Sequence, residues 1–286
     1  MAGFVNVKEI VDQAYTNGKN WYTAFRKVPA LATTLGIWAD LSFAPGSPRP
    51  NYKIGNELEG TRFTGAYGIY HGSPVTTDGF KFLHKLMVGC VSANVIPGTF
   101  ILCDYLFFYP LIDLDSTDYQ VFDNTVTSLP RYINGEGVKA YLVATNPYVG
   151  GQVFQITYTN QSGVAGQTSE WVTANTATNI ATILNSGVGN PYRGPFIQLQ
   201  SGDRGIRSVD GIQMFAPNGG LAALVLVRPL ATVIASDVQC VSETDFLIDL
   251  PSLPKIYDGA YLNLLFCPNG SAAAVPIFGE LTVIWR

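Results

Sequence analysis

The spacing of apolar residues predicts a helical N-terminus. Apolar side chains recur at helical period after Asn6, a capping residue whose reciprocal partner, Glu9, lies three positions further on. Aromatic residues continue the pattern after a glycine and up to Pro29. We therefore predict an amphipathic helix, or a broken pair of helices, over residues 6–28. Its apolar face packs either against its own domain or against a neighbouring subunit.

A proline-rich segment separates this region from the rest of the chain. From Phe43 to Lys53 the sequence FAPGSPRPNYK holds three prolines and a glycine, which neither a helix nor a central strand accommodates. We therefore predict a boundary here. An N-terminal helical arm takes residues 1–42, and a β-sandwich core, as one unit or as two packed β subdomains, takes residues 54–286.

Beyond this boundary the pattern is that of an antiparallel β-protein. Residues 154–159 alternate between apolar and polar, which predicts a strand with one buried and one solvated face. Further strands are predicted from apolar runs at Thr99–Tyr109, Val138–Leu142, Ile206–Phe215, Leu221–Leu230, Tyr261–Cys267 and Leu281–Trp285. Asn-Gly pairs at 134–135, 218–219 and 269–270 are typical of tight turns, and the second is expected to join two strands as a hairpin. The pattern predicts a mainly β fold, an antiparallel, jelly-roll-like sandwich, and allows one more short helix at Thr176–Leu184.

The low charge of the chain suggests partners. Of its 286 residues, 47% are hydrophobic and only 13% are charged, against roughly 25% charged in an ordinary soluble domain. Such a surface is either packed against other subunits or hydrated by Thr, Ser, Asn and Gly.

The sign and distribution of the charges exclude several classes of function. The net charge is −4 and the basic residues are scattered, so direct contact with nucleic acid is not expected. No apolar stretch reaches the roughly 18 residues of a membrane span. Charged residues at positions 8, 9 and 12 interrupt the apolar core that a signal peptide needs, which predicts synthesis in a reducing cytoplasm.

The four cysteines do not have the spacing of a metal site. Cys90, Cys103, Cys240 and Cys267 form no C-x-x-C pair and have no histidine at ligand spacing. Each lies in or beside an apolar run, so we expect buried thiols, with disulfides as the alternative, and no zinc.

Signatures of catalysis are missing from the sequence. It contains no G-x-S-x-G, no G-x-x-x-x-G-K-[ST] and no H-E-x-x-H, and the glycines at 187, 189 and 194 have the wrong spacing for a dinucleotide site. A triad of Ser73, His71 and Asp78 would be purely local, so His71 is better explained as a polar turn residue. We expect no catalytic residues, no cofactor and no enzymatic activity.

One acidic stretch is the strongest candidate for ion binding. Asp104, Asp113, Asp115, Asp118 and Asp123 fall in a segment without basic residues, where paired carboxylates are also compatible with glycoside hydrolysis. An EF-hand calcium loop has Gly at its sixth position and Glu at its twelfth. A loop that starts at Asp113 has Asp118 and Asn124 at these positions, which argues against calcium. We therefore expect a solvated acidic loop, or one paired with an arginine of a neighbour, and no metal.

Three stretches of the chain resemble virion proteins of tailed bacteriophages, and together they cover under a third of the sequence. They are LCDYLFFYPLIDLDSTDYQVFDNTVTSLPRY (Leu102–Tyr132), SGDRGIRSVDGIQ (Ser201–Gln213) and LPSLPKIYDGAYLNLLFCPNGSAAAVPIFGELTVIW (Leu250–Trp285). None of them is a catalytic motif.

The resemblance implies a structural virion protein of the head-decoration or cement type. Such a protein is made in the host cytoplasm and lies on the capsid surface, where it binds major capsid protein subunits and neighbouring copies of itself, by analogy as a trimer. The alternative is a tail component or a receptor- or carbohydrate-binding module of the particle. A glycan-cleaving enzyme, the third reading, would need two facing carboxylates in a cleft.

Overall fold

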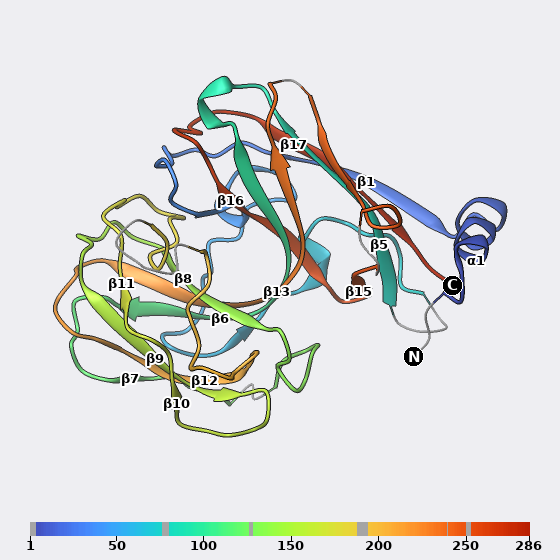
Figure 1. Ribbon diagram of the computed structural model, residues 1–286. Coiled ribbons are helices and arrows are strands. Elements are labelled where there is room, and N and C mark those ends of the chain that lie inside the picture. Colours follow the sequence, from blue (N-terminus) through green and yellow to red (C-terminus); the bar gives the residue numbers. More distant parts are fainter. Residues whose placement is uncertain (1–3, 76–79, 126–127, 188–193, 239, 250–252) are drawn as a thin grey trace.

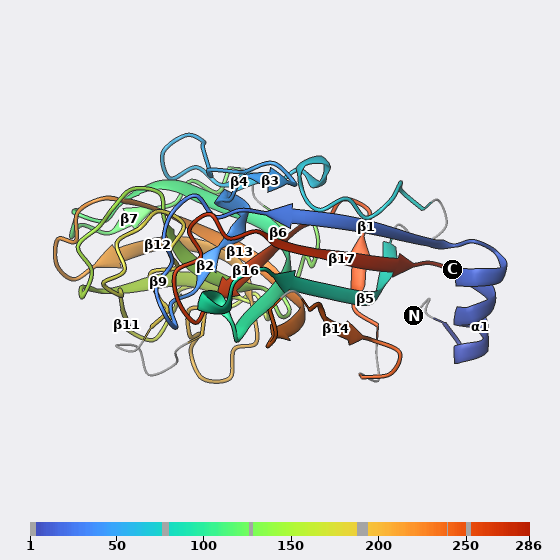
Figure 2. The ribbon, with the colours of Figure 1, turned by 90° about the horizontal axis from the view of Figure 1, so that it is seen from above.

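The computed structural model describes residues 4–75, 80–125, 128–187, 194–238, 240–249 and 253–286, and it is mainly β (Figures 1 and 2). The strands are β1 Asn20–Lys27, β2 Ala39–Asp40, β3 Gly46–Ser47, β4 Thr61–Arg62, β5 Phe80–Cys90, β6 Gly98–Asp113, β7 Gln120–Val121, β8 Lys139–Ala144, β9 Val153–Asn160, β10 Gln167–Thr168, β11 Val172–Thr173, β12 Ile206–Met214, β13 Leu221–Ala235, β14 Ser242–Asp245, β15 Lys255–Tyr257, β16 Tyr261–Cys267 and β17 Ile277–Ile284. The helical elements are α1 Val7–Val11, a π-helical turn at Asp12–Thr16, and 3₁₀ turns at Leu41–Phe43, Gly65–Tyr67 and Ala93–Val95.

The strands form three antiparallel sheets. The N-terminal sheet has the order β14-β5-β17-β1-β3, with β15 also paired to β5. The central sheet has the order β2-β16-β6-β13-β8, with β4 also paired to β6. The distal sheet has the order β10-β9-β12-β7, with β11 also paired to β9.

The central sheet is shared by two hydrophobic cores. Leu86 of β5 and Phe100 of β6 lie in one cluster, between the N-terminal and central sheets. Leu106, further along β6, lies in a second cluster with Ile156 of β9, between the central and distal sheets. The ladder between β6 and β13 contains three register shifts, which let these long strands bend from one core to the other. The predicted antiparallel β-sandwich is therefore confirmed, and two sandwiches share one sheet.

A third cluster covers the opposite face of the central sheet. Trp38, Phe43 and Phe63, from the segment that follows β1, pack here against Tyr105 and Tyr141 of the sheet. The proline-rich segment is therefore part of the core. The segment is held by the buried side chain of Lys27, whose Nζ donates hydrogen bonds to the backbone oxygens of Ala44 and Pro48 at 3.0 and 2.6 Å.

The predicted helix is wrong beyond residue 16. Asn20–Lys27 is a strand, and it pairs with β17 along its whole length. The burial of this segment has period 2 at its end, since Phe25 and Lys27 are buried while Ala24 and Arg26 are exposed. Aromatic spacing alone is compatible with both periods, and pairing with a strand from the other end of the chain selects β.

The separate N-terminal arm predicted for residues 1–42 is likewise not observed. β1 lies inside the N-terminal sheet, and β2 pairs with β16 in the central sheet. Instead, α1 and the π-helical turn after it project from the sandwich, next to the C-terminus and at the far end from the distal sheet (Figure 1).

The other strand predictions are confirmed, although β6, β13 and β17 each extend four or five residues beyond one predicted end. β9 shows the predicted alternation over all its residues. Two details are wrong. Asn218-Gly219 is not a hairpin turn, because β12 and β13 belong to different sheets. Residues 176–184 are not helical, because Ile183 forms a β-bridge with Val143 and so extends the central sheet.

Candidate functional site

The most polar buried feature is a charged network around Asp40. Its carboxylate lies 3.2 Å from Lys53 Nζ, and both side chains are fully buried. Tyr105 and Tyr141 donate hydrogen bonds to the two carboxylate oxygens, at 2.7 and 2.8 Å, and the backbone N–H of Ser42 donates a third at 2.8 Å. The carboxylate is therefore fully engaged, and its chemistry is structural.

The ionisation of this network follows from its burial. Burial opposes the charge on Asp40, but the Lys53 ammonium and the hydrogen bonds outweigh burial and hold the pKa of the carboxyl below its ordinary value. Burial lowers the pKa of the Lys53 ammonium, an effect that Asp40 opposes. Burial also lowers the pKa of Lys27 to about 8. Sequence patterns gave no signal for this network, because its members come from distant segments.

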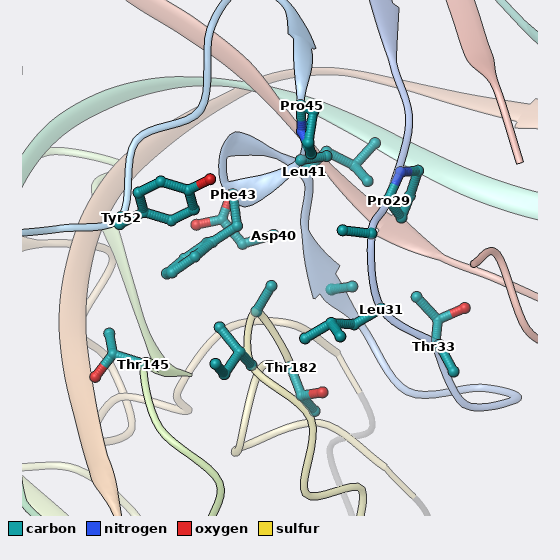
Figure 3. A pocket seen from close by; sticks show the side chains of 16 residues that line it. Pro29, Leu31, Thr33, Asp40, Leu41, Phe43, Pro45, Tyr52, Thr145 and Thr182 are labelled. Carbon is teal, nitrogen blue, oxygen red and sulfur yellow. The ribbon is translucent and has the colours of Figure 1, made fainter. Parts of the chain in front are cut away.

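A cavity of about 310 Å³ lies beside the network (Figure 3). Its walls come from three segments, residues 29–33, 39–45 and 180–182, with Tyr52 and Thr145 at one side. Most of the lining is apolar, and its acid, Asp40, already has its partners. The cavity is suited to an apolar group and offers no general acid or base.

The acidic stretch does not form one site. Asp113, Asp115, Asp118 and Asp123 are exposed, as expected for a solvated loop. Asp104 is an exception to that expectation, because it is buried and accepts two hydrogen bonds from Arg131, at 2.8 and 2.6 Å. Within the described ranges, no group of three or more His, Cys, Asp or Glu side chains is arranged to hold a metal ion.

The structure buries His71, which the sequence analysis interprets as a polar turn residue. Its Nε2 lies 3.2 Å from the carbonyl oxygen of Ala260. Burial, helped by the nearby Lys81 ammonium, lowers the pKa of His71 to about 4. Ser73 contacts the hydroxyl of Tyr70 at 3.3 Å, and Asp78 lies outside the described residues.

The cysteines are all free thiols, and their burial differs from the prediction in part. Cys90 and Cys103 are buried, as expected, whereas Cys267 is half-buried. Cys240 is exposed.

The N-terminal helical segment is apolar on two faces. Ile10 and Ala14 are buried against Ile284 of β17. On the solvent side, Val7, Val11 and Tyr15 follow one another at four-residue spacing, with exposed fractions of 63%, 45% and 64%. We call these three residues the apolar stripe. A helix of this kind has one partner in its own domain and room for a second.

Comparisons with known proteins do not indicate a family for this chain. The chain matches no known protein-family profile and no curated protein. Among solved structures, the crystal structure of the infectious bursal disease virus VP2 subviral particle aligns with 97% of this chain and 86% of that chain. The identity is 7% and the TM-score is 0.15, a value too low to indicate a shared fold. In the part of the chain that the structure describes, no helix is both long and apolar enough for a membrane span.

Proposed function

We propose that this protein is a structural component of a tailed-phage particle, a head-decoration protein that stabilises the head by binding major capsid protein subunits and neighbouring copies of itself. The observation that carries the proposal is the exposed apolar stripe of the N-terminal helical segment. Exposed apolar side chains at regular helical spacing favour burial against another protein surface.

Two further features support an assembly role. The chain carries few charges, so large parts of its surface present neutral side chains to a neighbour. The helical segment is also fixed to the sandwich, because Glu9 pairs with Arg286 at 2.9 Å and Ile10 is buried. A fixed stripe loses less conformational entropy on binding than a disordered arm would.

The test is incorporation into particles. Heads that lack this protein are mixed with the purified chain and sedimented, and the copies bound per head are counted. Hundreds of copies are expected for a head-decoration protein, whereas a handful would indicate a neck or tail position.

A matched pair of variants makes the test specific for the stripe. Val11→Asp with Tyr15→Asp is expected to abolish sedimentation with heads, while the unfolding midpoint of the free chain stays near that of the wild type. Thr16→Asp, an exposed polar position beside the stripe, serves as the control and is expected to bind. Normal binding by the double variant would overturn the role of the stripe.

A further inference from the structure

A cationic cleft with aromatic walls opens where the two sandwiches meet. Each sheet supplies one lining residue: Arg228 comes from β13 of the central sheet, Arg207 from β12 of the distal sheet, and Tyr257 from β15 of the N-terminal sheet. The loop at 130–136 completes the cleft, which encloses about 680 Å³. A cleft of this size accommodates a small ligand of one or two sugar rings.

The positive charge of the cleft is not neutralised by neighbouring acids. Arg131 is paired with the buried Asp104, and Glu136 is paired with Arg204 at 3.4 Å. No described carboxylate forms an ion pair with Arg207 or Arg228 within 4.0 Å. In a chain with a net charge of −4, this local excess of cations favours an anion.

Two lysines next to the cleft add to this field. Lys139 lies opposite Val227 in the ladder between β8 and β13, and its ammonium is close enough to the Arg228 guanidinium for the two charges to repel each other. Burial, and after it the Arg228 guanidinium, lowers the pKa of Lys139. Lys255 lies in β15, where its Nζ is 5.8 Å from the centre of the Tyr257 ring.

The walls of the cleft offer aromatic rings and a polar amide. Tyr132 and Tyr257 pack edge to face, with ring centres 5.1 Å apart. The Arg228 guanidinium lies 5.6 Å from the centre of the Tyr132 ring and donates a hydrogen bond to the backbone oxygen of Glu136 at 3.0 Å. These contacts hold the guanidinium in place. Asn134 supplies an amide at the rim.

We propose that this cleft binds a sugar that carries a carboxylate, such as a uronic acid residue of a glycan. A planar guanidinium binds a carboxylate through two parallel hydrogen bonds, and a tyrosine ring packs against the apolar face of a sugar. This site is independent of the proposed role in the capsid, because it lies at the junction of the sandwiches and does not include the apolar stripe.

The test compares two sugars that differ only in the acid group. The full-length chain is titrated by calorimetry at low ionic strength with sodium glucuronate, with glucose and with sodium acetate. Glucuronate is expected to bind saturably and at least tenfold more tightly than glucose or acetate, with an affinity that falls as salt is added. If glucose binds equally well, the role of the charge is refuted. If acetate does, the role of the sugar ring is refuted, and no binding of glucuronate refutes the site.

Variants locate the binding in the cleft. Arg207→Gln removes an exposed cation that pairs with no described carboxylate, so the fold is expected to persist while the affinity for glucuronate falls at least tenfold. Arg26→Gln changes another exposed arginine, on β1 and outside the cleft, and is expected to bind as the wild type does. Undiminished binding by Arg207→Gln, or an equal loss in both variants, would place the sugar elsewhere and overturn the proposal.

Discussion

At the scale of single residues, a few buried ionisable groups depend strongly on their surroundings for their charge. Asp40 balances the Lys53 ammonium inside an aromatic core, and His71 is neutral because burial disfavours its charged form. Buried charges without partners are costly, so each group constrains the residues around it.

Replacing the central carboxylate is expected to be strongly destabilising. Asp40→Asn keeps the size of the side chain but leaves the buried Lys53 ammonium without a counter-ion, which costs about 3–5 kcal/mol. Asp115→Asn, at an exposed position, is the control and is expected to stay within about 0.5 kcal/mol. Chemical denaturation of the three proteins measures both effects, and equal stability of both variants would mean that Asp40 does not pair with a charged lysine.

Acid sensitivity is expected from His71. Its pKa is lowered to about 4 in the folded state, against about 6.5 in the unfolded chain. The unfolded chain therefore binds the proton first. The stability contributed by this group is complete above pH 6.5 and is lost between pH 6.5 and 4, by about 3 kcal/mol in total. Unfolding curves across this range are compared with those of His71→Gln, which is expected to have a shallower slope. Identical slopes would contradict the assignment.

At the scale of elements, the two ends of the chain are joined in one sheet. β1 lies between β17 and β3, so the first long strand is held by the last. The helical segment before it contributes less, since its buried residues, Ile10 and Ala14, contact the sheet only at Ile284 and its neighbours.

Two truncations are expected to separate these elements. Deletion of residues 1–17 removes the helical segment and is expected to leave a folded sandwich, with a loss of about 2 kcal/mol for the burial of Ile10. Deletion of residues 1–28 also removes β1 and leaves the edge of β17 without its partner, so cooperative unfolding is expected to disappear. Circular dichroism during heating measures the unfolding transition of each truncated chain. A cooperative transition in the longer deletion would show that the sandwich folds without β1.

Substitutions of the acidic residues at the end of β6 and in the loop after it are expected to have little effect on the stability of the fold. Asp113→Ala, Asp115→Ala and Asp118→Ala together change exposed side chains and are expected to shift the free energy of unfolding by less than about 1 kcal/mol. Addition of calcium is expected to leave the melting temperature of the wild type unchanged. A calcium-dependent rise in the wild type that the triple variant lacks would instead identify an ion site.

At the scale of the whole molecule, the surface carries few charges for its size, since only 13% of the residues are charged. The chain exposes 12105 Å², close to the 1.2 × 10⁴ Å² or so expected for a compact monomer of this mass. Its size is therefore ordinary, and the low charge of its surface is the unusual property. Symmetric association is a common way to bury such a surface.

The purified protein is accordingly expected to be oligomeric, or to bind a capsid lattice. Light scattering at increasing concentration is expected to give a mass above the 30.9 kDa of one chain, and by analogy with decoration proteins we favour a trimer. A stable monomer that also fails to sediment with heads would contradict both the association and the proposed function.

The sequence by itself determined the features that depend on near neighbours. Alternation over 154–159 predicted β9, and apolar runs predicted β6 and β13, although the long strand β5 was not predicted. The cap predicted by Asn6 is present, with the N–H of Glu9 donating to its side chain at 2.9 Å. Such features are encoded within a few residues, because strand faces and helix caps need only local spacing.

Tertiary structure alone decided the rest. β1 became a strand because β17, more than 200 residues away in the chain, supplies its hydrogen-bonding partner. Asp40 contacts Tyr141, and Arg207 and Arg228 line one cleft, only because the fold brings distant segments together. Burial then fixes the charges of such groups. The free energy of an ionised side chain depends on the solvent and the partners around it, and these are set by the fold and not by neighbours in sequence.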